Sequence, residues 1–435
     1  MDVSNQNSHH ADDEVNILVD HLFRHKTAQV ISTLTRIFGI EHLDLAEDVV
    51  QETLLKALRQ WPFSGVPKNP GGWILHSAKN LAIDILRREA LFHDKADEIA
   101  FQLKQEMRSS ADAPDDFDDG GLKSDQLRMM FTSCHPALSQ EVQVALTLKT
   151  LCGLSTEEIA KAFLTQEAAI AQRLVRAKRK IRDEKISLEM PPAAEFPERL
   201  NSILQVLYLL FNEGYNSHGG ENLIRDELCA EAIRLTMLLA EHPVGDIPIV
   251  HALLALMLLQ ASRLPARIDA QGRLLLFAEQ DRSLWDRDLI SRGLCHLERS
   301  GEGNELTIYH LQAGIAAFHA TAASYESTDW KNILSFYDTL ATLDRSPVVA
   351  LNRAVALAMI DGPNTGIAAL KKIEADPSLQ SYYLLPATLG EFYMQLGDLR
   401  KAGDYYKTAL TLAGTEPERR FLLDKIQACC GNGVK

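Results

Sequence analysis

Apolar side chains recur at helical spacing along most of the chain and divide it into short amphipathic segments. Residues 44–61 carry one apolar face, and residues 72–89 repeat the pattern after a Pro- and Gly-rich break at 62–72. Steps of three and four residues indicate a helix with one buried stripe. Asp44 and Glu47 have the spacing of a capping box, so we expect the first helix to begin there. Both segments are predicted to be helices.

A second pair of helices is predicted at 155–182. Ser155 and Glu158 have capping-box spacing, and Thr165 is placed to cap the second helix. In that helix, apolar residues recur at steps of four, three and four, at Ile170, Leu174, Ala177 and Ile181. The residues left outward are polar, small or cationic: Ala169, Gln172, Arg173, Arg176, Lys178, Arg179, Lys180 and Arg182. Two short helices around a tight turn, the second cationic, indicate a helix-turn-helix that binds DNA. The alternative is a cationic surface helix in a bundle.

The 72–89 segment also carries a combination of side chains typical of nucleic-acid binding. Trp73 can stack on a base, Asn80 can bond a base edge, and Arg87 and Arg88 can hold phosphate. Lys79 and Asp84 share the outward face with them. The preceding helix, in contrast, presents a mainly acidic and amide face that includes Asp48, Gln51 and Glu52.

The order of these segments resembles the extracytoplasmic-function (ECF) group of sigma-70 RNA polymerase sigma factors. The matching segments are AEDVVQETLLKAL, NPGGWILHSAKNLAIDILRR, an acidic linker and the helix-turn-helix, which together span residues 14–186. Three later segments, LYLLFNEGYNSHGG, DRSLWDRDLI and SPVVALNRAVALA, resemble the C-terminal extension of the long members. The turn FLTQEAAIAQR departs from the family, whose turn more often contains Gly and whose second helix starts Thr-Val-Lys-Ser-Arg. The bases that are read are therefore left open.

The resemblance implies a role for particular residues, with core RNA polymerase and promoter DNA as partners and no cofactor or metal. The surface that docks on core polymerase is Asp48, Gln51, Glu52 and Leu55. The minus-10 element is read and melted by Trp73, Lys79, Asn80, Asp84, Arg87 and Arg88, with Asn80 facing an extruded base that stabilises the open duplex. The minus-35 contacts are Ala169, Gln172, Arg173 and Arg176, with Lys178 and Arg179 on the DNA backbone.

The resulting fold class is all-α, with two small helical sigma domains followed by a helical extension. We expect a disordered tail at 1–13, sigma region 2 at 14–92, an acidic linker at 93–121, sigma region 4 at 122–188 and the extension at 195–435. The linker is expected to be a flexible solvated spacer. Alternatively, its negative charge follows a path through the polymerase that nucleic acid would otherwise take.

The extension is helical by its periodicity. Leu200, Ile203, Leu204, Leu207 and Phe211 form one stripe, and a second stripe formed by Leu228, Ala232, Leu235 and Leu239 ends at His242-Pro243. A tetratricopeptide-like unit is predicted from Leu389, Gly390, Tyr393, Gly397, Ala402, Tyr406 and Ala409, with a degenerate unit before it at 346–373. We expect one superhelical block that regulates activity or docks a protein or peptide partner.

One polar cluster in the extension could hold a ligand. DRSLWDRD at 281–288 follows Arg263, Arg267 and Asp269 and precedes His310 and His319. The expected role of these residues is to lock helices together. No set of nucleophile, base and orienting group is visible, so we predict no catalytic activity.

Composition changes this picture little. A net charge of −14 argues against indiscriminate DNA binding, although residues 167–185 hold seven Lys or Arg against three acids. The six cysteines form no CxxC pair, and Cys134-His135 falls short of a metal-ligand set. The N-terminus is polar, and the most apolar run, 247–261, is too short to span a bilayer. We therefore expect a cytoplasmic protein without membrane contact.

Two alternatives come from other functional classes. A helix-turn-helix regulator with a tetratricopeptide-like sensor explains 155–182 but gives the helices of 44–88 no role. A tetratricopeptide-like scaffold that does not bind DNA explains the second half and treats the cationic helix as ordinary surface.

Overall fold

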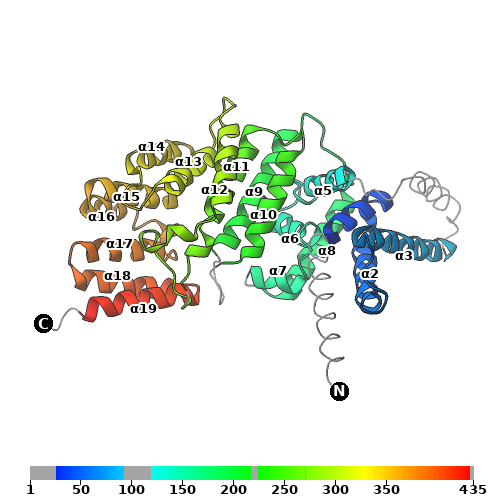
Figure 1. The fold of residues 1–435 in the computed structure, drawn as a ribbon, viewed down its shortest axis with the longest axis horizontal. Helices are drawn as coiled ribbons and strands as arrows, with labels where there is room; N and C mark the ends of the chain where they lie inside the picture. Colours follow the sequence, from blue (N-terminus) through cyan, green and yellow to red (C-terminus); the bar gives the residue numbers. More distant parts are fainter. Residues whose placement is uncertain (1–25, 93–118, 164, 217–223, 270, 432–435) are drawn as a thin grey trace, which may run out of the picture. The chain divides into compact units, whose positions relative to one another are not determined.

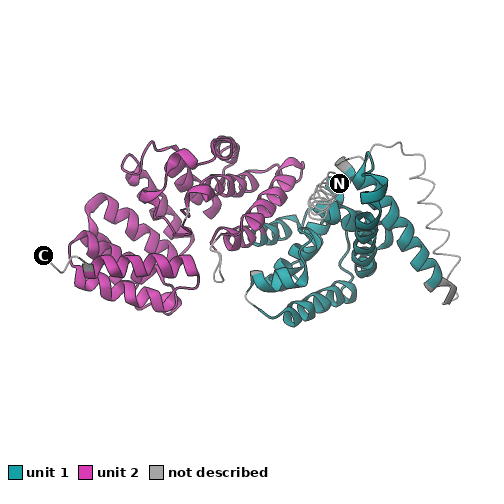
Figure 2. Cartoon of the chain, turned by 60° about the horizontal axis from the view of Figure 1, so that its bottom comes forward, with its two compact units in different colours: residues 1–206 teal, residues 207–435 magenta. Residues whose placement is uncertain are grey.

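The computed structural model describes residues 26–92, 119–163, 165–216, 224–269 and 271–431 of the 435-residue chain. Within these residues the secondary structure is helical and holds no strand, apart from one isolated bridge between Ile268 and Leu274. The chain divides into two compact units, residues 1–206 and 207–435, and the division falls inside one helix (Figure 2). The predicted all-α class is confirmed.

Most helices follow one another closely, whereas α11 and α12 are joined by a longer segment, 262–286, that contains three 3-10 turns (Figure 1). After a helical segment at 26–38, the α-helices are α2 (Leu43–Ser64), α3 (Pro70–Phe92), α5 (Asp119–Ser133), α6 (Gln140–Thr150), α7 (Thr156–Ala162), α8 (Glu167–Asp183), α9 (Phe196–Tyr215), α10 (Asp226–Glu241), α11 (Pro248–Ala261), α12 (Arg287–Ser300), α13 (Ile308–Thr321), α14 (Trp330–Leu343), α15 (Pro347–Asp361), α16 (Pro363–Lys371), α17 (Leu384–Gln395), α18 (Leu399–Leu412) and α19 (Glu416–Gly431). Short 3-10 turns are η1 (Ile40–His42), η2 (Leu264–Ala266), η3 (Phe277–Glu279), η4 (Arg282–Leu284) and η5 (Pro377–Leu379).

The helix pair α2 and α3 buries the faces that periodicity predicts. On α2 the predicted apolar stripe is almost fully buried, and on α3 Ile74, Ala78 and Leu86 are buried. The capping box predicted at Asp44 and Glu47 is wrong, because α2 begins at Leu43 and its N-cap His42 makes no side-chain cap. The predicted break at Pro62 also comes too early. A proline in the last turn removes only one backbone hydrogen bond, and α2 continues to Ser64, where Gly65 turns the chain with φ of 79°.

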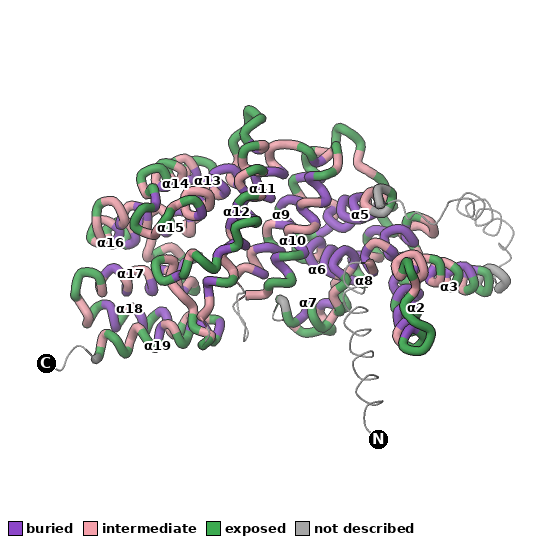
Figure 3. The backbone as a smooth tube through the Cα atoms, viewed as in Figure 1, coloured by how far each residue is buried: buried purple, intermediate pink, exposed green. Residues whose placement is uncertain are grey.

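The helix-turn-helix is formed by α7 and α8. The capping box of α7 is confirmed, with Ser155 Oγ accepting from the Glu158 N–H and Glu158 accepting from the Ser155 N–H. The stripe of α8 is buried as predicted (Figure 3). The N-cap, however, is Gln166 rather than Thr165. The Thr165 N–H donates to the Ala160 carbonyl at 3.0 Å, so Thr165 still belongs to the turn that closes α7.

The predicted acidic linker, 93–121, overlaps the start of α5. This helix begins at Asp119, so residues 119–121 are helical rather than part of a linker. Residues 93–118 and the predicted tail at 1–13 lie outside the described residues.

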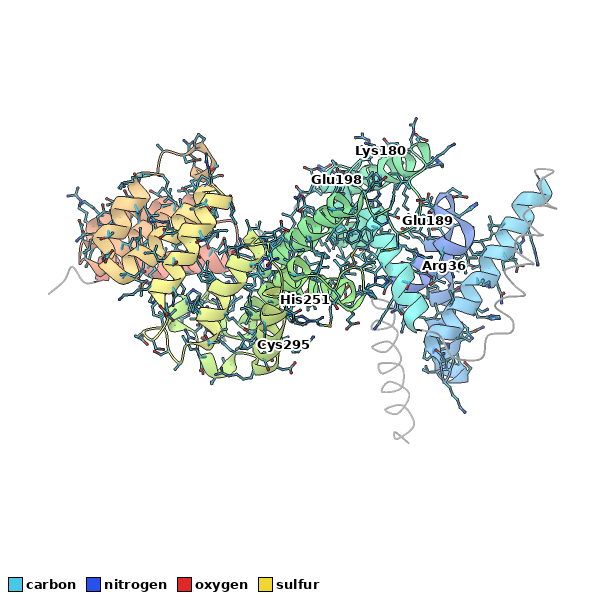
Figure 4. The ribbon with its side chains drawn as sticks, turned by 90° about the horizontal axis from the view of Figure 1, so that it is seen from above. Arg36, Lys180, Glu189, Glu198, His251 and Cys295 are labelled. Carbon is cyan, nitrogen blue, oxygen red and sulfur yellow. The ribbon has the colours of Figure 1, made fainter. Side chains whose placement is uncertain are left out.

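Three ion pairs join the segment 26–64 of the first unit to its α5–α8 part. Arg36 Nε lies 2.8 Å from Asp125 Oδ1, and the Asp125 side chain is 6% exposed (Figure 4). Lys178 of α8 contacts Asp44 and Glu47 at the start of α2. Asp44 and Glu47 therefore serve as long-range partners rather than as a cap.

In the second unit α11 packs against α10, α12 and α13, and helical hairpins from α14 to α19 follow along the chain. The predicted stripes of α9 and α10 are buried, and α10 ends at Glu241 before His242-Pro243 as predicted. The prediction that the most apolar run is too short to span a bilayer needs correction. Residues Pro248–Ala266 are long and apolar enough by composition, and 72% of this stretch is buried inside the protein. The burial is that expected for the central helix of a soluble fold.

The predicted tetratricopeptide-like unit is the hairpin of α17 and α18, which lie side by side with α19 (Figure 1). A Cβ on Gly390 would come within 2.9 Å of the Tyr406 ring, and Tyr406 is fully buried. Gly397 has φ of 78° in the turn between the two helices. The small residues therefore allow the close helix approach that the sequence predicts.

Candidate nucleic-acid interface

The solvent side of α8 is a continuous surface opposite its buried stripe. Six of its exposed residues alternate at steps of three and one, and they are here called the outer face of α8: Ala168, Ala171, Gln172, Val175, Arg176 and Arg179. Glu167, Lys180, Arg182 and Asp183 are also exposed. A helix of this kind can place small, amide, apolar and cationic groups along one edge of a DNA groove.

The residues predicted to contact the minus-35 element differ in their exposure and in whether another side chain already binds them. Gln172 and Arg176 belong to the outer face, and no side-chain partner is recorded for either among the described residues. Arg173 is only partly exposed and binds Glu141 of α6 at 3.1 Å. Arg179 binds Asp183 one turn later at 3.3 Å. Ala169 is partly buried at the edge of the face.

Lys178 is the most constrained cation of α8. Its side chain is 17% exposed, its Nζ lies 2.9 Å from Glu47 Oε2, and it also donates to Asp44 Oδ1. Burial would lower the pKa of Lys178, but the two carboxylates outweigh that effect and raise it. In this arrangement its ammonium is engaged by acids of α2 rather than available to phosphate. Lys180, one turn away from Arg176, donates to the Ala137 carbonyl (Figure 4).

The predicted polymerase-docking residues form a stripe on α2. Asp48, Gln51, Glu52 and Leu55 are all exposed, and their spacing of three, one and three places them on one helical face. The Leu55 side chain is 52% exposed. An apolar residue of that size among carboxylates and an amide is suited to contact with another protein.

The predicted minus-10 residues all lie on α3. Asn80, Asp84, Arg87 and Arg88 are exposed, while Lys79 and Trp73 are partly buried. The Asn80 amide is 3.0 Å from His76 Nε2. The Trp73 ring meets the buried Trp61 edge-on at 5.5 Å between centroids, with the Lys56 ammonium 5.9 Å from its centre. One edge of Trp73 is thus used for packing.

Sequence reasoning missed two groups of exposed apolar residues. Val175, 66% exposed, lies on the outer face of α8 between Gln172 and Arg176, where it could meet a thymine methyl group. Phe63 is 92% exposed at the end of α2, and Val66 follows at 37%. The sequence signal that could have identified them is an apolar residue on the polar face of a predicted amphipathic helix or just beyond its end.

Cys134 and His135 are the residues of the first unit that most resemble a metal or catalytic pair. No group of three or more potential metal ligands is present in any described part of the chain. Burial raises the pKa of the Cys134 thiol to about 12, and the neighbouring Thr147 only partly opposes this. The thiol next to His135 is therefore protonated at neutral pH and is not an activated nucleophile.

The chain is similar to three families of known proteins. Residues 22–91 match sigma-70 region 2, residues 128–181 match sigma-70 region 4, and residues 199–301 match a family of unknown function (DUF6596). An uncharacterized protein of Rhizobium meliloti (strain 1021) is 36% identical over 397 residues, which covers 91% of this chain and 92% of that protein.

These matches fall on the helices that carry the candidate surfaces. The region 2 match contains α2 and nearly all of α3, and the region 4 match contains α7 and almost all of α8. Region 2 has no role in a simple helix-turn-helix regulator or in a scaffold, so neither alternative accounts for the chain. The protein belongs to the sigma-70 family of bacterial transcription initiation factors, as an ECF-like sigma factor with a C-terminal extension.

Proposed function

We propose that this sigma factor uses three helical surfaces in promoter-specific initiation and that its second unit regulates their use. Family membership supports binding of core RNA polymerase and of promoter DNA. The residue assignments rest on the observation that the outer face of α8 is an exposed stripe opposite a buried one. The same family supports a soluble, cytoplasmic protein, and we propose no enzymatic activity because sigma factors act by binding.

The α2 stripe is the proposed contact with core polymerase. Asp48 and Glu52 supply negative charge, Gln51 supplies an amide, and Leu55 supplies an apolar centre that is exposed in the free protein. Burying Leu55 on a partner would remove apolar surface from water, while the acids would favour a basic partner surface and set the docking orientation.

The α3 helix is the proposed reader of the minus-10 element. Asn80 can exchange its contact with His76 for a base edge, and Arg87 and Arg88 are exposed for phosphate. The packing of Trp73 on Trp61 fixes its ring plane, which leaves the partly exposed face for stacking on an unpaired base.

The outer face of α8 is the proposed reader of the minus-35 element. Gln172 and Arg176 can reach base edges without giving up another side-chain partner, and Val175 adds an apolar contact. Arg173, Arg179 and Lys178 each have a carboxylate partner, so their use on DNA requires exchange of that partner for phosphate.

A run-off transcription assay with purified core polymerase tests the α8 assignment. The variant Gln172→Ala/Arg176→Ala should lose promoter-dependent transcript, with each lost base contact costing about 1–3 kcal/mol. The matched control is Arg345→Ala, an exposed arginine of the second unit. Equal transcription from the double variant and the wild-type protein would exclude the assignment.

The regulatory role of the second unit is tested by truncation. A cut at the end of the predicted region 4 domain, 122–188, would remove Arg199 and Phe196 from the first unit. Arg199 donates to the Phe131 carbonyl at 2.8 Å, and the Phe196 ring lies 5.6 Å from the Phe131 ring. A chain ending after Asn216 keeps α9 and these contacts. Circular dichroism checks that the shortened chain retains its helices. If it does, transcription equal to that of the full chain would contradict a regulatory role.

A further inference from the structure

Three arginines of the second unit gather around a cluster of aromatic rings. Arg263 and Arg267 flank the 3-10 turn η2 after α11, and Arg282 opens η4. The Arg263 guanidinium carbon lies 3.7 Å from the centre of the Phe277 ring. The Arg282 guanidinium carbon lies 4.5 Å from the centre of the Trp285 ring. The rings therefore hold two cations close to one another.

The cluster extends to the next helical hairpin. His319 of α13 lies 4.5 Å from Phe277 between ring centres, and Trp330 of α14 lies 5.2 Å from His319. These contacts bring together residues from η3, η4, α13 and α14 within one compact unit.

Within the part of the chain that the structure describes, none of the three arginines has an Asp or Glu at ion-pairing distance. Arg263 Nε donates to Gln280 at 3.3 Å, Arg267 donates to the Tyr215 carbonyl and to Asn216, and Arg282 donates to the His319 and Ala322 carbonyls at 2.8 Å each. The exposed Glu326 acts on Arg282 only through space. The cluster therefore carries an excess of positive charge.

The cluster also contains hydrogen-bond donors that lack an acceptor. Arg282 Nη2, the Trp285 indole N–H and the Trp330 indole N–H are buried without a partner in the described part of the protein. Trp285 is 2% exposed. Arg263 is only partly buried, and no hydrogen bond is recorded for its two terminal nitrogens. His319 Nδ1 is a fourth buried polar atom of the cluster without a partner among the described residues. Burying a polar group without a hydrogen bond costs free energy, so four such atoms in one cluster favour a polar ligand that bonds to them.

The pKa shifts of His319 and Arg263 are consistent with a positive potential in this cluster. Burial, helped by Arg263 and Arg282, lowers the pKa of His319 to about 3, so this imidazole is neutral. Burial lowers the pKa of Arg263 to about 10; the nearby Tyr215 partly opposes this, and Arg267 and Arg282 add smaller lowering effects. Both directions are those expected in a buried region of positive potential, which an anion would relieve.

We propose that this cluster binds a small organic oxyanion, a carboxylate or phosphate compound with a flat apolar part. Arg263 and Arg282 supply the charge and the forked donors, the indole N–H groups of Trp285 and Trp330 supply further donors, and Phe277 supplies the apolar face. Arg263 and Arg282 are both only partly buried, so the cluster can be reached from solvent beside them. If the second unit regulates initiation as proposed above, this ligand is its effector.

Binding is tested on the full-length protein with two probes, sodium benzoate and sodium phosphate, each compared with sodium chloride at equal ionic strength. The thermal midpoint and the tryptophan emission are followed as each probe is titrated. At least one probe should raise the midpoint in a saturable way. Benzoate alone would indicate a carboxylate ligand, and phosphate alone would indicate a phosphorylated one.

Two variants locate the site. Arg263→Gln should abolish the saturable shift, and Arg263→Lys, which keeps the charge but loses the fork, should weaken binding at least tenfold. Arg345→Gln is the matched control and should bind like the wild-type protein. The proposal is overturned if neither probe gives a saturable shift with the wild-type protein, or if the shift survives in Arg263→Gln. These outcomes are independent of transcription, so they are distinguishable from failure of the proposed function.

Discussion

The contact between Lys178 and the acids of α2 is expected to restrain the DNA-binding helix in the free protein. Glu47 and Asp44 hold the ammonium of a residue that lies beside the outer face of α8. Two carboxylates at this position also repel phosphate. The double variant Asp44→Asn/Glu47→Gln should therefore release α8 and raise the affinity of the free protein for minus-35 DNA.

The size of the effect follows from the burial of the pair. The Lys178 side chain is 17% exposed and that of Glu47 is 10% exposed, with 2.9 Å between Nζ and Oε2. Exposed pairs contribute about 0.2–1 kcal/mol and breaking a fully buried pair costs about 3–5 kcal/mol, so we expect about 1–2 kcal/mol here. If the ion pair favours the DNA-free arrangement of α8 by this free energy, removing the pair raises the affinity for DNA by about 5- to 30-fold.

Fluorescence anisotropy with a short labelled promoter duplex measures this affinity. Removing acids strengthens DNA binding through net charge alone, so the control is Glu41→Gln, an exposed acid just before α2. The control removes one charge and the double variant removes two, so the relevant quantity is the gain in binding free energy of the double variant beyond twice that of the control, at fixed salt. A gain no larger than twice that of Glu41→Gln, or a loss of affinity, would refute a restraining role for the contact.

Two further predictions concern the DNA-binding and polymerase-binding surfaces, and a third concerns buried histidines of the second unit. Arg176→Ala should weaken binding to promoter duplex by about 1–3 kcal/mol without changing the unfolding midpoint, because the side chain is exposed; equal affinities would remove it from the interface. Leu55→Asp should weaken binding to core polymerase by about 1–2 kcal/mol in a biolayer assay, since it replaces an exposed apolar centre by a charge; unchanged affinity would place docking elsewhere. Burial, with His251 and two arginines, lowers the pKa of His296 to about 4, and the pKa of His319 is about 3. The unfolded chain binds protons at these histidines below about pH 6.5, whereas the folded chain does not. The free energy of unfolding should therefore be highest above that pH and fall by about 2 kcal/mol between pH 7 and 5, after allowance for solvent screening. An unfolding free energy in urea that does not change with pH would contradict this.

Local patterns predicted most of the fold because helical burial is decided within a few turns. The stripes of α2, α8, α9 and α10 lie where the spacing of apolar residues places them. The capping box at Asp44 and Glu47 failed for a different reason. An acid pair at a helix start fits either a cap or a distant cation, and here the cation is Lys178, 134 residues away. Local spacing carries no information about such a partner.

The candidate site was predicted in outline and misjudged in detail. A helical stripe identifies the solvent side of α8, but the residues at its edges depend on what packs beside them. Arg173 lies at such an edge and meets Glu141 of α6, which only the tertiary fold brings near. Val175 was overlooked because an apolar residue is assigned to the core by default, whereas this one is 66% exposed.

The two sets of cations in this protein differ in what they demand of the fold. Arg176 and Arg179 lie in water, so a surface awaiting phosphate costs the free protein little. Arg263 and Arg282 are packed against rings and have no acid at ion-pairing distance among the described residues. The stacking of a guanidinium on an aromatic ring, about 0.5–2 kcal/mol, does not offset the removal of a charge from water. A cluster that served only to lock helices together would be more stable with apolar side chains of similar volume. The retained charge therefore favours an anion as the missing component of the second unit.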